Sequence, residues 1–137
     1  MNRTQRPDWE QLPEFQRILS MHALMPFAWG VHDCAVMASR VIALGRDVEL
    51  PVWSGELSAR RLLKERSLLL RTLDALGDPI PWGDCVVGDV AVARQETEDY
   101  AQRYVLAVFD GHQFLAPDMV RGLRALYASN MLLGWRC

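Results

Sequence analysis

The chain has 137 residues, 50% of them hydrophobic and 23% charged, which predicts one globular domain and excludes a disordered or low-complexity chain. Its formal net charge of −2 argues against a protein that binds nucleic acid through phosphate contacts. No apolar run is long enough for a transmembrane helix and no secretory signal is visible, so we expect a soluble protein made in the cytosol.

Helices are predicted in the first half of the chain. Apolar residues recur at three- and four-residue steps from Asp8 to about Leu24, which predicts a helix with Asp8 as its N-cap. Asp33 is expected to cap a second helix over Cys34–Leu44. Leucine periodicity predicts a third helical stretch over Glu56–Leu76.

Strands are predicted in the second half. The valine-rich stretch Val86–Ala93 and the stretch Tyr104–Phe109 are typical of strands. Asp110-Gly111 predicts a hairpin turn, from which His112–Ala116 returns. Met131–Cys137 is expected to be the last strand.

The order of these elements predicts the fold class α+β. Helices of about residues 8–76 are expected to pack on an antiparallel sheet of about residues 86–137, within one domain that spans residues 1–137.

The three cysteines are Cys34, Cys85 and Cys137, and they do not form a disulfide framework or a Cys-x-x-Cys pair. Cys34 is expected in the first turn of the second helix, where free backbone N–H groups and the helix dipole favour an anion. In that setting the pKa of a thiol can fall, and the thiolate can act as a nucleophile. Burial as an inert thiol is the alternative, because free cysteine is among the most buried residue types.

Several short motifs follow one another in a recognisable order from Phe27 to Arg136. They are Phe-x-Trp-Gly-x-His-Asp-Cys ending at Cys34, Gly-Asp-Val at 88–90, Asp-Gly at 110–111, Gly-Leu at 122–123 and a closing Gly-Trp-Arg. This order resembles the NlpC-like cysteine peptidases of the papain-fold group, and most closely a subgroup encoded among bacteriophage tail genes. The resemblance implies a papain-like fold, a cysteine nucleophile and cleavage of stem-peptide bonds in murein.

The resemblance also implies a histidine base at the start of the strand after Gly-Asp-Val, and the stretch Arg103–Phe109 contains no histidine. The candidates are therefore His32, which flanks Cys34, and His112, just past the Asp-Gly turn. His22 is interpreted as a partly buried structural residue. A surface position is the alternative for His112, and a position away from the thiol is the alternative for His32.

Other polar residues have structural interpretations. Asp33 is expected to be an N-cap rather than a catalytic acid, and Asp89 to hold the start of a strand by turn hydrogen bonds. The five tryptophans are expected to be core and interface anchors. A metal site built from cysteine and histidine is disfavoured, since His32-x-Cys34 alone has ligand-like spacing.

Three functions fit these residues, and whether the chain is an enzyme stays open at this point. The first is a phage tail-associated murein peptidase with Cys34 as nucleophile and His112 or His32 as base. The second is a catalytically degenerate relative that serves as a structural or assembly part of a phage tail tip. The third is a small-molecule or metal-binding module.

The expected partners are other phage tail or baseplate proteins and murein peptide, without nucleic acid, cofactor or transmembrane segment. The expected location is the host cytoplasm during synthesis and then the virion tail.

Overall fold

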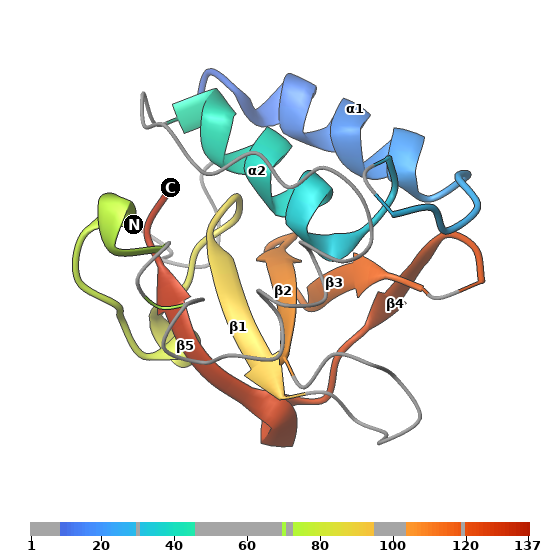
Figure 1. The fold of residues 1–137 in the computed structure, drawn as a ribbon. Coiled ribbons are helices and arrows are strands. Elements are labelled where there is room, and N and C mark those ends of the chain that lie inside the picture. The colour runs from blue at the N-terminus through green and yellow to red at the C-terminus, as the bar shows by residue number, and fades with distance from the viewer. Residues whose placement is uncertain (1–8, 30, 46–69, 71–72, 95–103, 119) are drawn as a thin grey trace.

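A computed structural model describes residues 9–29, 31–45, 70, 73–94, 104–118 and 120–137. Two helices, α1 (Leu12–His22) and α2 (Cys34–Gly45), pack side by side over one face of a five-stranded antiparallel sheet (Figure 1). The predicted α+β class is confirmed.

Strands β1 to β4 each pair antiparallel with the next strand in the sequence, whereas the last strand does not pair with the one before it. Their bounds are β1 (Val90–Arg94), β2 (Tyr104–Phe109), β3 (Phe114–Pro117), β4 (Leu123–Ala125) and β5 (Met131–Trp135). The order across the sheet is β4-β3-β2-β1-β5, so the last strand returns to pair with the first. The prediction of β2 over Tyr104–Phe109 is confirmed, and the Asp110-Gly111 turn joins it to β3.

Strand residues alternate between two faces of this sheet, because successive side chains of a strand point in opposite directions. One set packs with α1 and α2 in the main core and defines the helix face: Val90, Val92, Leu106 and Val108. The other set belongs to a second apolar cluster and defines the far face: Ala91, Ala93, Ala107 and Phe109. This division separates the candidate catalytic residues, as described below.

The helices differ from the prediction mainly at their ends. Helix α1 begins at Leu12 instead of Asp8, with Pro13 in its first turn, where a missing N–H is tolerated. Asp8, the predicted N-cap, lies outside the described residues. Helix α2 begins at Cys34 as predicted. The predicted Glu56–Leu76 helix falls largely outside the described residues, and its described end is the 3-10 helix η1 (Asp74–Leu76).

Strand β1 begins at Val90 and not at Val86, where the sequence predicted its start. Residues 86–89 form a tight turn, closed by an N–H of Asp89 that donates to the Val86 carbonyl at 3.0 Å, and the strand begins at Val90. Gly88 has a φ of 91°, and a Cβ at this position would lie 2.4 Å from the ring of Trp9. Valine propensity alone therefore misplaced the strand start, since a glycine-dependent turn comes first.

The other strand ends moved by one or two residues. Strand β3 begins at Phe114, two residues after the predicted start, and β5 ends at Trp135. Strand β4 and the 3-10 helices η2 (Trp82–Asp84) and η3 (Ala128–Asn130) were not predicted.

Candidate functional site

Cys34 occupies the first position of α2, and the helix start is capped as the sequence predicts. The Asp33 carboxylate Oδ1 accepts the N–H of Val36 at 2.8 Å, which confirms the N-cap. The Cys34 side chain is 4% exposed and packs within the main core, and it has a backbone hydrogen bond with Leu106 of β2. The sulfur therefore sits between the start of α2 and the middle of the sheet.

Burial decides the protonation state of this thiol. Desolvation raises the pKa of Cys34 to about 12, and the Asp33 carboxylate acts in the same direction. The Leu106 backbone and the Arg124 guanidinium favour the thiolate, but their effect is smaller. The expectation of a lowered pKa at the helix N-terminus is wrong, because the sulfur loses more from leaving water than it gains from the helix end. Cys34 is a neutral thiol in this structure.

Two of the three histidines pair with each other. His22 and His32 are both fully buried, and their rings stack with centroids 4.9 Å apart. Their Nδ1 atoms are 2.6 Å apart. The outer nitrogens are also occupied: His22 Nε2 lies 2.9 Å from the Arg40 guanidinium, and His32 Nε2 lies 3.1 Å from the carbonyl oxygen of Gly122. We call this arrangement of His22, His32, Arg40 and the Gly122 carbonyl the histidine chain.

One placement of protons satisfies every group in the histidine chain. Arg40 can only donate, so His22 Nε2 accepts and His22 carries its proton on Nδ1. That proton is donated to His32 Nδ1, which leaves the His32 proton on Nε2, where the Gly122 carbonyl accepts it. Both rings are then neutral. Burial, His32 and Arg40 together lower the pKa of His22 to about 4, which agrees with this assignment.

The third histidine lies elsewhere. His112 follows the Asp110-Gly111 turn, and the Asp110 Oδ1 accepts the backbone N–H groups of His112 at 2.8 Å and Gln113 at 2.7 Å. Phe109 and Phe114, which flank this turn, belong to the far-face cluster, whereas Cys34 belongs to the main core. The structure therefore does not bring His112 together with Cys34.

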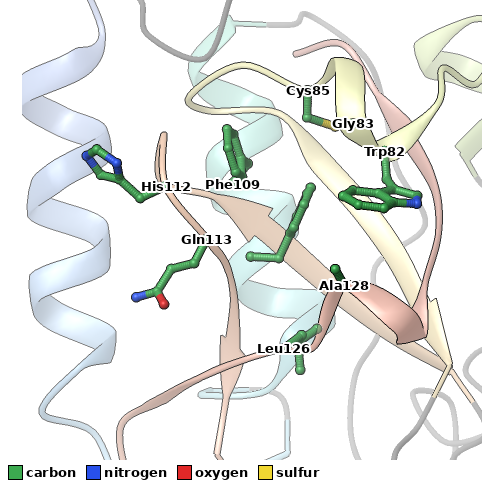
Figure 2. Close-up of a pocket in the computed structure, with 9 residues that line it drawn as sticks. Trp82, Gly83, Cys85, Phe109, His112, Gln113, Leu126 and Ala128 are labelled. Atoms are coloured by element: carbon green, nitrogen blue, oxygen red, sulfur yellow. The ribbon is translucent and has the colours of Figure 1, made fainter.

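His112 contributes to a shallow pocket of about 270 Å³ next to the far face. Figure 2 shows the lining residues, which are Trp82, Gly83, Cys85, Phe109, His112, Gln113, Phe114, Leu126 and Ala128. The walls include the rings of Trp82, Phe109 and Phe114. The His112 ring and the Gln113 amide point away from the Trp82 and Phe109 rings in this view. Burial, followed by the nearby Asp89 carboxylate, raises the pKa of Cys85 to about 12, so this thiol is also unreactive.

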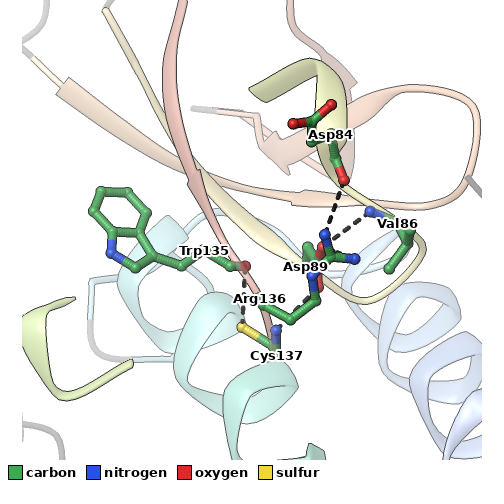
Figure 3. A network of polar contacts seen from close by, with 6 residues as sticks. All are labelled: Asp84, Val86, Asp89, Trp135, Arg136 and Cys137. Carbon is green, nitrogen blue, oxygen red and sulfur yellow. Dashed lines mark hydrogen bonds and ion pairs between the residues drawn. The ribbon is translucent and has the colours of Figure 1, made fainter. Parts of the chain in front are cut away.

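Asp89 is the centre of a second buried polar arrangement, shown in Figure 3, which we call the Asp89 network. Its carboxylate accepts the backbone N–H groups of Val86 and Cys137, each at 2.9 Å, and lies 3.5 Å from the Arg136 guanidinium. Arg136 also donates to the Asp84 carbonyl at 3.1 Å. The expected structural role of Asp89 in holding the start of β1 is confirmed, and the network joins that turn to the residues after β5.

No group of three or more histidine, cysteine, aspartate or glutamate side chains is arranged to hold a metal ion in the described part of the chain. Among these residues, no helix has both the length and the apolar character needed to cross a membrane.

A family model described as a domain of unknown function, DUF6950, matches residues 4–137. The chain belongs to the DUF6950 family. No curated protein and no solved structure gives a significant match.

Sequence reasoning placed Cys34, Asp33 and Asp89 but missed the histidine chain. One indication was present: His22 follows Phe15 and Ile18 at helical spacing, so it shares the buried face of α1. The partnership with His32 and Gly122 has no comparable pattern, because it depends on how the β3–β4 connection folds back onto the end of α1.

Proposed function

We propose that this chain is a component of a bacteriophage tail tip that keeps an NlpC-like, papain-type arrangement of helix and sheet and uses it as a scaffold. The order of motifs from Phe27 to Arg136 supports the relationship. The packing of the Cys34 end of α2 against β2 is also what a papain-type fold requires. In this proposal, the protein is made in the host cytoplasm and then joins the virion tail.

The scaffold role is supported by the buried, neutral thiol of Cys34 together with the positions of the imidazoles, none of which is placed as a base for this thiol. The thiol is 4% exposed and has a pKa of about 12. His32, a candidate base, has both ring nitrogens engaged by His22 and Gly122. His112, the other candidate, lines the far-face pocket. A thiol without an adjacent base is a poor nucleophile at neutral pH.

Exposed apolar side chains supply a surface for assembly. Leu24 is 76% exposed and Val31 is 51% exposed, both on the connection between α1 and α2. Val120, which is 78% exposed, lies on the β3–β4 connection, and its carbonyl accepts the N–H of Phe27 at 3.0 Å. Contiguous exposed apolar patches mark protein–protein contacts, and the backbone bond between the two connections places these side chains on joined segments. We propose that other tail proteins bind here.

A murein peptidase is the second candidate, and the position of Cys34 favours it. The cysteine is the first residue of α2, and both the Leu106 backbone and Arg124 act to stabilise its thiolate. If substrate binding opened the site to water or supplied a base, this position would suit a nucleophile.

Thiol labelling and murein digestion separate the two candidates. With iodoacetamide at pH 7, we expect Cys34 and Cys85 of the native protein to react at least about 100-fold more slowly than in urea. We expect no release of stem-peptide amines from purified murein. Amine release that disappears in Cys34→Ala would overturn the scaffold role and establish the peptidase.

The assembly role has its own test. Mass spectrometry of purified particles of the encoding phage should detect the protein. The double variant Leu24→Ser/Val120→Ser should be lost from these particles, whereas Gln113→Ser, a change at an exposed polar residue, should be retained. Particles without the wild-type protein would contradict the proposal.

A further inference from the structure

The histidine chain joins four separate segments at one buried point. His22 ends α1, His32 precedes α2, Arg40 lies within α2, and Gly122 belongs to the β3–β4 connection. The same connections also touch through backbone bonds: Phe27 donates to Val120 at 3.0 Å and Gly122 donates to Met25 at 2.9 Å. The two histidine rings therefore lie beneath the contact between the α1–α2 and β3–β4 connections.

The fit around Gly122 is close. Its φ is 75°, and a Cβ at this position would lie 2.9 Å from the Ala23 carbonyl oxygen at the end of α1. Its own carbonyl accepts two hydrogen bonds, one from the N–H of His32 Nε2 and one from the Asp118 N–H at 2.8 Å. The bond from His32 therefore ties this carbonyl of the β3–β4 connection to the α1–α2 connection, in addition to its bond within the β3–β4 connection.

The histidine chain has no free acceptor for an additional proton. With both rings neutral, one Nδ1 donates and the other accepts across 2.6 Å. A proton added to either ring places two N–H groups against each other at this distance, or places one against the Arg40 guanidinium. Since the rings are fully buried, water cannot relieve the conflict while the segments stay closed.

We propose that the His22–His32 pair is an acid-sensitive latch that holds the β3–β4 connection against the α1–α2 connection at neutral pH and releases it on protonation. Opening is coupled to proton uptake because the His22 imidazole, once separated from His32 and Arg40, regains water and its ordinary basicity. The latch acts on the segments that carry Leu24, Val31 and Val120, so acid would rearrange this exposed apolar surface.

The charged groups around the pair determine the direction of this effect. Arg40 on α2 opposes protonation, and it lies within hydrogen-bond distance of His22. On the α1–α2 connection, the Asp33 carboxylate is committed to the Val36 N–H. On the β3–β4 connection, the Asp118 carboxylate accepts the N–H of Val120 at 2.8 Å, and Arg121 is exposed. The lowered pKa of His22, about 4, is in accord with this balance.

Amide hydrogen exchange on the full chain tests the latch. The reporters are the amides of Phe27 and Gly122, which cross between the two connections, and the control is the Gly88 amide, which donates to Phe109 at 2.9 Å in another part of the fold. Between pH 7 and pH 5 we expect the exchange rates of the reporters relative to Gly88 to rise about tenfold. An unchanged ratio would overturn the proposal.

Glutamine replacement supplies matched variants, because an amide offers one acceptor and one donor without binding a proton. In His22→Gln/His32→Gln the ratio should stay flat with pH, and in His112→Gln it should rise as in the wild type. An equal rise in the double glutamine variant would assign the effect to carboxylates and overturn the latch.

If the double glutamine variant does not fold, measurements on the wild-type protein still test the proposal. Long-range ¹H–¹⁵N spectra of the imidazoles should show His22 with its proton on Nδ1 and His32 with its proton on Nε2 at pH 7. Protonation of either ring should accompany the rise in exchange at Phe27 and Gly122. Protonation near pH 6.5 without any change in exchange would overturn the proposal.

Discussion

The Asp89 network and the surroundings of Cys34 are both buried, but the first stabilises a charged group and the second keeps its group neutral. The Asp89 carboxylate is surrounded by donors: two backbone N–H groups and the Arg136 guanidinium. Cys34 has a backbone hydrogen bond from Leu106, but burial outweighs it and the sulfur stays neutral. The histidine rings near the start of α2 are also neutral. A buried group in this protein is therefore placed to bear charge where several donors converge, and stays neutral where they do not.

This comparison bears on the motifs that suggested a peptidase. Gly88-Asp89 forms a turn and anchors the network, and Arg136 reaches back to it. Gly134, in the closing Gly-Trp-Arg, leaves space for Cys85, whose sulfur would lie 2.4 Å from a Cβ at that position. These motif residues maintain the scaffold whether or not Cys34 is reactive. The largest losses of stability are thus expected from the Asp89 network and the smallest from Cys34.

The most damaging change is expected to be Asp89→Ala. It leaves the N–H groups of Val86 and Cys137 buried without this acceptor, and it removes the carboxylate that forms an ion pair with Arg136, at a cost of about 3–5 kcal/mol in the free energy of unfolding. Urea denaturation measures the loss. Asp84→Ala is the control, because the network uses only the Asp84 backbone carbonyl, and it should change stability by less than about 0.5 kcal/mol. Similar losses in the two variants would contradict the central role of the Asp89 carboxylate.

Gly88→Ala is expected to cost about 2–3 kcal/mol, since a side chain at a φ of 91° is strained and its Cβ would overlap the Trp9 ring. Gly83→Ala is the matched control, because nothing lies within 4 Å of its added Cβ. Thermal denaturation of both variants checks the difference. A Gly88→Ala protein as stable as Gly83→Ala would show that Trp9 and the turn can move apart freely.

Acid should weaken the protein through His22. Its pKa in the folded protein, about 4, is below its ordinary value of 6.5, so the unfolded chain takes up the proton first. The stability contributed by the neutral ring is complete above about pH 6.5 and is lost as the pH falls toward 4, by about 2 kcal/mol at pH 5. Urea denaturation from pH 7 to 5 should show a smaller decline in His22→Gln than in the wild type. Parallel declines would contradict a buried neutral His22.

Cys34→Ala is expected to have the smallest effect, a loss of about 1 kcal/mol from the missing sulfur contacts, with no dependence on pH between 6 and 8. The same urea measurements suffice. A gain in stability would point the other way, to a cysteine held at an energetic cost for the sake of activity.

The sequence predicted the parts of this molecule that depend on local chemistry. Asp33 before Cys34 located α2, and a run of apolar residues ended by Asp110-Gly111 located β2. The start of β1 was misplaced because Gly88 meets Trp9, a contact across most of the chain. Local chemistry at Cys34 also predicted the wrong direction for its pKa, because the depth of burial depends on how the sheet packs beneath the helix. The pairing of His22 with His32 depends in the same way on tertiary structure.

The place of β5 beside β1 has a consequence for how the chain reaches its native state. Val90 pairs with Trp135, and Asp89 accepts the N–H of Cys137, so these contacts close a loop of more than 40 residues. Contacts between distant parts of a sequence slow folding, because chain entropy is lost before the contacts form. During synthesis, α1, α2 and the β2–β3 hairpin can form first, while the edge of β1 stays open until β5 leaves the ribosome. This late closure makes the open edge of β1 the segment most exposed to wrong pairing in a newly made chain.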